Sequence, residues 1–82
     1  MDLMRNQWLQ AFGVTLRHYR AKKGISQERL AHEAGIDRTH MNVLEAGHSN
    51  PSLNTVRRIC AALDISIEEW AVEMGKHIKK HR

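Results

Sequence analysis

The chain has 82 residues, a length that allows one small domain. Its formal net charge of +4 gives that domain a basic surface. Its single cysteine, Cys60, excludes an intrachain disulfide, and its six histidines lack the Cys/His spacing of a zinc finger, so we expect neither a metal nor a cofactor. No apolar run approaches the ~20 residues of a membrane span, and no secretory signal is recognisable, so we expect a soluble cytoplasmic protein without membrane contact.

Apolar residues recur at helical spacing along the chain and predict an all-α domain of five helices. The first predicted helix carries Leu9, Phe12, Leu16 and Tyr19 on one side. It is expected to end near Gly24, because glycine is common directly after the last turn of a helix. We treat residues 1–82 as a single domain, since no linker or repeat interrupts the pattern.

Two short helices are predicted next, joined by a tight turn at Gly35. Ser26 is the expected N-cap of the first helix and Asp37 that of the second, which ends near Gly47. Glycine at position 35 can adopt the positive φ that ends one helix and redirects the chain. Two helices joined by about three residues form a helix-turn-helix, which here spans 27–46 and lies at the centre of the domain. The residues expected to face the core are Leu30, Ala31, Ala34, Ile36, Met41 and Leu44.

The last two predicted helices close the core. The fourth begins after Ser52, and its inward residues are Leu53, Val56, Ile59, Cys60 and Leu63. The fifth covers about 66–80 and begins with a capping box made by Ser66 and Glu69. Its apolar stripe is longer than a small core requires, so we predict a homodimer interface there, with packing on the fourth helix as the alternative. The predicted interface residues are Ile67, Trp70, Met74 and Ile78.

The outward face of the third predicted helix has an unusual composition for a solvated surface. At 100° per residue, Arg38, Thr39, Asn42 and Val43 share this face. They offer a guanidinium, a hydroxyl, an amide and a small apolar group, which match the base edges of the DNA major groove. We therefore predict base contacts from these four residues. The alternative for each is an ordinary surface side chain.

Four stretches resemble the Cro/cI-type (XRE-like) helix-turn-helix family: ISQERLA at 25–31, AGI at 34–36, the run 37–47 and NPSL at 50–53. The resemblance covers residues 12–70 and implies a lambda-repressor-like domain. Such a protein would bind double-stranded DNA as a homodimer on a palindromic operator and regulate transcription in a prokaryote, including that of its own gene. The short chain and the DRT opening at 37–39 resemble the controller proteins of restriction–modification systems.

The resemblance also implies roles for single residues. Arg20 and Glu45 match a family pair that forms an interior salt bridge between the first and third helices. Contacts with DNA phosphates are implied for Gln27, His40, His48, Ser49 and Asn50.

Two functional hypotheses remain at this point. The first is a sequence-specific repressor or activator of transcription, an activator having RNA polymerase as a further partner. The second is an antitoxin-type module whose main partner is a protein toxin. An enzyme is rejected, because the sequence offers no nucleophile–base pair with supporting spacing and no phosphate-binding glycine loop.

Overall fold

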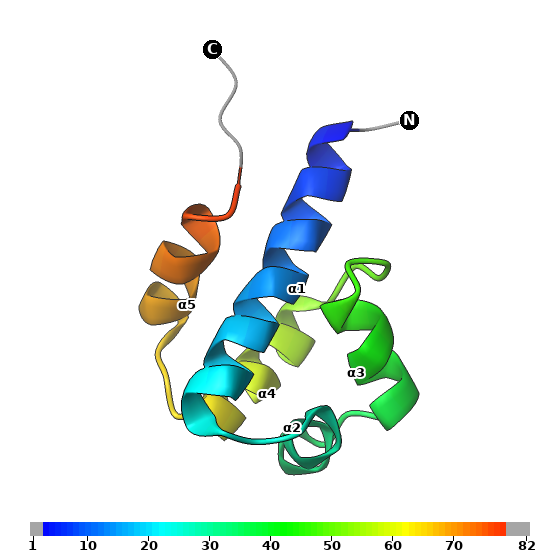
Figure 1. The fold of residues 1–82 in the computed structure, drawn as a ribbon, viewed down its shortest axis with the longest axis vertical. Helices are drawn as coiled ribbons and strands as arrows, with labels where there is room; N and C mark the ends of the chain where they lie inside the picture. Colours follow the sequence, from blue (N-terminus) through cyan, green and yellow to red (C-terminus); the bar gives the residue numbers. More distant parts are fainter. Residues whose placement is uncertain (1–2, 79–82) are drawn as a thin grey trace.

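The computed structural model describes residues 3–78, and this part of the chain contains five helices and no strand. The helices are α1 (Leu3–Lys23), α2 (Gln27–Ala34), α3 (Arg38–Glu45), α4 (Leu53–Leu63) and α5 (Ile67–Gly75). The long helix α1 runs through the molecule, with α5 along one side and the α2–α3 pair on the other (Figure 1). The prediction of an all-α five-helix domain is confirmed. None of the described helices is long and apolar enough to span a bilayer.

Short polar side chains set where four of the helices begin. Each N-cap has an extended backbone, and its side chain accepts a hydrogen bond from an amide in the first turn, which would otherwise lack a partner. The predicted caps are all present: Ser26, Asp37, Ser52 and Ser66. Glu69 completes the predicted capping box at α5.

The core lies between the helices, where α1 packs against α3, α4 and α5 and α2 packs against α3 and α4. Its buried apolar side chains are Phe12, Leu16, Leu30, Ala31, Ala34, Met41, Leu44, Ile59, Cys60, Leu63 and Trp70. Leu53 was expected among them, and that prediction is wrong, because its side chain is 81% exposed. It is the first residue of α4, one turn before the part of that helix that packs against its neighbours.

The predicted fifth helix is shorter than expected. It ends at Gly75, and the chain turns at Lys76 and His77, so the predicted extension towards residue 80 is wrong within the described part of the chain. Glycine is a poor helix former, which is consistent with an end at this point. Residues 79 and 80 of the predicted span lie outside the described residues.

Trp70 belongs to the chain's own core rather than to an open face of α5. Its side chain is 3% exposed and packs against two aromatic rings of α1, with centroid separations of 4.9 Å to Phe12 and 6.0 Å to Tyr19. Tyr19 also donates a hydrogen bond from Oη to the backbone oxygen of Glu69, at 3.3 Å. Trp70 thus docks α5 on α1, and its burial there removes it from the predicted dimer surface.

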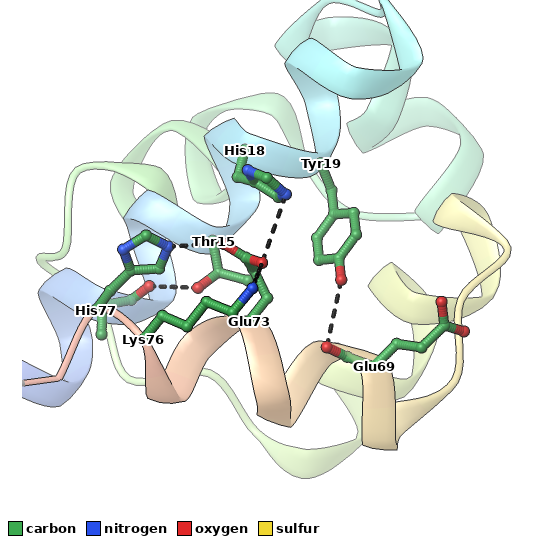
Figure 2. A network of polar contacts seen from close by, with 8 residues as sticks. Thr15, His18, Tyr19, Glu69, Glu73, Lys76 and His77 are labelled. Carbon is green, nitrogen blue, oxygen red and sulfur yellow. Dashed lines mark hydrogen bonds and ion pairs between the residues drawn. The ribbon is translucent and has the colours of Figure 1, made fainter.

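A polar network around Glu73 adds to this docking (Figure 2). The carboxylate lies 3.0 Å from His77 Nε2 and 3.3 Å from Lys76 Nζ, and His18 Nε2 of α1 approaches it to 3.6 Å. Desolvation acts to raise the pKa of Glu73, but the hydrogen bonds with His77 and Lys76 outweigh it and hold the pKa below its ordinary value. The carboxylate therefore stays charged where α5 meets α1.

Candidate nucleic-acid interface

The position of α3 is fixed by a close backbone contact with α1. A Cβ atom built on Gly13 would overlap the backbone carbonyl oxygen of Glu45 and would lie 2.9 Å from its carbonyl carbon. Real Cβ atoms do not come so near, so α1 and the last turn of α3 can cross at this distance only because residue 13 has no side chain. Arg17 adds a hydrogen bond from Nη1 to the same carbonyl oxygen, at 3.0 Å.

Arg20 and Glu45 form the interior pair that the family resemblance implied. Arg20 Nε lies 2.8 Å from Glu45 Oε2 and Nη2 lies 2.7 Å from Oε1, a bidentate geometry that carries both charge and direction. Arg20 also donates from Nη1 to the backbone oxygen of Ile25, at 3.0 Å. The hydrogen bond with Glu45 raises the pKa of Arg20, so the guanidinium keeps its charge. One side chain of α1 thereby holds both α3 and the segment that leads into α2.

The turn between α2 and α3 has the conformation expected from its glycine. Gly35 has φ +67°, and Ile36 donates its backbone amide to Ala31 at 2.9 Å. Asp37 then caps α3 by accepting the amides of Thr39 at 3.0 Å and His40 at 3.4 Å. These local bonds set the angle between the two helices and point the outer face of α3 away from the core.

Four polar side chains from α2 and α3 surround a shallow hollow of about 300 Å³. They are Gln27, Arg38, Thr39 and Asn42, and we call this feature the recognition hollow. Asn42 Nδ2 donates to Gln27 Oε1 at 3.2 Å, which joins the start of α2 to the middle of α3 on the outside. Three of the four predicted base-contacting residues therefore lie together, next to a predicted phosphate-contacting residue. The fourth, Val43, follows Asn42 in the sequence. Its side chain is half-buried and does not line the hollow.

The remaining predicted phosphate contacts lie at the edges of this face. His40 is exposed in the first turn of α3, while the other three lie in the loop that joins α3 to α4. In that loop His48 and Asn50 are exposed and Ser49 is half-buried. The backbone amide of His48 donates to the backbone oxygen of Val43 at 3.0 Å, so the loop begins with a hydrogen bond to α3.

One charged residue of this face was not anticipated from the sequence. Glu28, in the first turn of α2, places Oε2 at 4.0 Å from Arg38 Nη1, and both side chains are more than 70% exposed. The sequence feature that could have pointed to Glu28 is its position directly after Gln27, a predicted phosphate contact. Which residues of α3 it meets depends on the angle between the helices, so the sequence pattern did not identify it.

The described residues contain no group of three or more His, Cys, Asp or Glu side chains able to hold a metal ion. Cys60 is buried, and desolvation raises the pKa of its thiol above the ordinary value. A thiol of this kind stays protonated and behaves as a small apolar core residue.

The helix-turn-helix family model HTH_3 matches residues 16–70 of the chain. A Neisseria meningitidis protein named as a hypothetical transcription factor is 37% identical over 79 residues, which is 95% of this chain and 74% of that protein. The Bacillus subtilis transcriptional regulator SlrR is 34% identical over 70% of this chain. That match covers 38% of SlrR, so the chain spans well under half the length of this relative.

Two solved structures of restriction–modification controller proteins have the same fold. C.AhdI of Aeromonas hydrophila is 42% identical with a TM-score of 0.73, over 76% of this chain and 94% of that one. C.Esp1396I, solved as a tetramer in complex with its natural 35-base-pair operator, is 26% identical with a TM-score of 0.81. That match covers 89% of this chain and 96% of the controller protein.

Proposed function

The chain belongs to the helix-turn-helix family HTH_3, and we propose that it is a regulator of transcription that binds double-stranded DNA in a sequence-specific way. The single observation that carries the proposal is the recognition hollow on the outer face of α2 and α3. An α-helix fits the major groove, where arginine can donate to guanine O6 and N7 and asparagine can pair with the edge of adenine. Arg38, Thr39 and Asn42 are the proposed base contacts, with Val43 available for a thymine methyl group.

Contacts with the DNA backbone would fix the register of the protein on the duplex. Gln27 begins α2, where free backbone amides and the helix dipole favour a phosphate. His40 on one side, and the loop residues His48, Ser49 and Asn50 on the other, are the further proposed phosphate contacts. A repressor bound in this way would exclude RNA polymerase from a promoter, whereas an activator would contact it, in either case in the cytoplasm of a prokaryote.

The function is tested by titrating the protein into labelled duplex from upstream of its own gene, with shuffled duplex as the control, at two salt concentrations. Tight, salt-dependent binding to the native duplex alone is the expected result. Equal weak binding to both would mean either that the operator lies elsewhere or that a protein toxin is the main partner, and a pull-down would then distinguish the two. Absence of binding at low salt would contradict the proposal.

Arg38→Ala should weaken binding to the native duplex by about 1–3 kcal/mol and relax the preference for one base pair. The reason is the loss of a bidentate donor to guanine. Arg29→Ala is the matched control, since it removes the same charge from an exposed side chain of α2 that pairs with Glu33 outside the recognition hollow. Quantitative gel-shift titrations of both variants on single-base-substituted duplexes would measure the effect. Equal losses for the two would remove Arg38 from the base-contacting set.

We also propose that the protein acts as a homodimer, so that two copies read the two halves of a palindromic site about one helical turn apart. The proposed interface is an apolar groove of about 420 Å³ between α4 and α5, with Leu53 and Ile67 exposed on its rim. Ile67 was predicted at the interface and lines this groove, whereas Trp70, which was also predicted there, is buried in the chain's own core. Met74 and Ile78 are half-buried and would lie at its edge at most.

Leu53→Asp should convert the dimer to a folded monomer, because a charge at the rim would be desolvated on association. Sedimentation velocity checks the assembly, and circular dichroism checks the helices. Val72→Asp is the control, since Val72 is also exposed on α5 but does not line the groove. Loss of the dimer in Val72→Asp alone would move the interface to the other side of α5.

A further inference from the structure

The ion pair between Glu28 and Arg38 has no evident use in the folded chain alone. Both side chains are more than 70% exposed, and the two charged atoms are 4.0 Å apart. Exposed pairs of this kind contribute little to stability. A carboxylate in the first turn of α2 does suit the helix dipole, but that interaction does not require it to lie beside Arg38. We therefore look for the role of this ion pair in the contact with DNA.

Arg38 has two kinds of acceptor on a DNA duplex. Phosphate oxygens are charged, are present at every step and carry no sequence information, whereas guanine O6 and N7 are neutral and depend on sequence. A carboxylate beside the guanidinium repels an approaching phosphate, which carries a full negative charge, more strongly than it repels the neutral edge of a guanine. It can also accept a hydrogen bond from the exocyclic amine of a cytosine.

Glu28 is well placed to act in this way. It directly follows Gln27, whose side chain is hydrogen-bonded to Asn42, in the first turn of α2, and the packing of α2 against α3 places its backbone beside that helix. The other acidic side chain near the start of α3, Asp37, is committed to capping the amides of Thr39 and His40.

We propose that Glu28 is a specificity-determining residue whose carboxylate competes with DNA phosphates for the guanidinium of Arg38 and directs it to a guanine. The inference rests on the proposed function, because it assumes that the recognition hollow faces a duplex. Its consequence is that Glu28 lowers non-specific affinity more than specific affinity.

The test compares Glu28→Gln with the wild type on two probes: a duplex selected by the wild-type protein from a random library, and a shuffled version of it. Affinity for the shuffled duplex should rise by about threefold to tenfold, while affinity for the selected duplex should change by about twofold or less. The salt dependence on the shuffled duplex should steepen by about one counterion, because Arg38 becomes free to contact a phosphate.

Glu68→Gln is the matched control, since it removes the same charge from an exposed residue of α5, a helix that packs on α1 and α4. It should leave the ratio of the two affinities unchanged. Glu28→Gln should also have no effect on the ratio when Arg38 is already alanine. Equal behaviour of the two glutamine variants would overturn the inference and leave the regulator function standing. A wild-type protein that selects no sequence at all would overturn the proposed function itself.

Discussion

A Gly13→Ala variant should be less stable than the wild type by about 1–3 kcal/mol, although alanine is the better helix former. The new methyl group would overlap the backbone carbonyl oxygen of Glu45, and backbone cannot rotate out of the way as a flexible side chain can. The strain must be relieved by moving α3 away from α1. Urea unfolding followed by circular dichroism measures the loss.

Gly75→Ala is the control for this prediction. A Cβ atom there would meet nothing within 4 Å, so the substitution should be neutral or slightly stabilising. Because α3 carries the proposed base contacts, Gly13→Ala should also weaken binding to specific duplex at temperatures where the variant remains folded. A Gly13→Ala variant as stable as Gly75→Ala would show that the crossing of α1 and α3 tolerates a side chain.

Arg20→Met should cost about 3–5 kcal/mol of unfolding free energy, because it leaves the Glu45 carboxylate without its partner in the interior. The side chain of Glu45 is 7% exposed, and methionine retains the volume of the arginine stem but none of its donors. The loss approaches the whole stability expected of so small a domain. Thermal and urea unfolding would measure it.

Arg29→Met removes an equally short ion pair, with Glu33, from the surface, where the arginine side chain is 65% exposed. Its cost should stay within about 1 kcal/mol. The double variant Arg20→Met/Glu45→Met should recover much of the loss, since it leaves no unpaired interior charge. Similar costs for the two arginine variants would mean that Glu45 finds water or another partner when Arg20 is removed.

The helices and their starting points could be predicted from the sequence because they depend on local chemistry. Ser26, Asp37, Ser52 and Ser66 cap the amides that follow them directly, and apolar spacing along each helix gives the side that faces the core. The grouping of Arg38, Thr39 and Asn42 followed from the same periodicity.

Features that depend on how helices meet could not be predicted in this way. Apolar spacing showed that Trp70 lies on a stripe but not that α1 covers it, and it placed Leu53 inward although its side chain is exposed at the start of α4. The need for glycine at position 13 and the approach of Glu28 to Arg38 arise from crossings between helices. Sequence spacing within one helix carries no information on those crossings.

The two sides of α3 have separate functions. Met41, Leu44 and Glu45 are buried and hold the helix in place, while Arg38, Thr39 and Asn42 are exposed and take no part in the core. Substitutions on the outer side should therefore carry little penalty in stability. Duplicated copies of such a gene could diverge in the operator they prefer while every copy keeps the same fold, so the architecture permits drift in recognition without drift in structure.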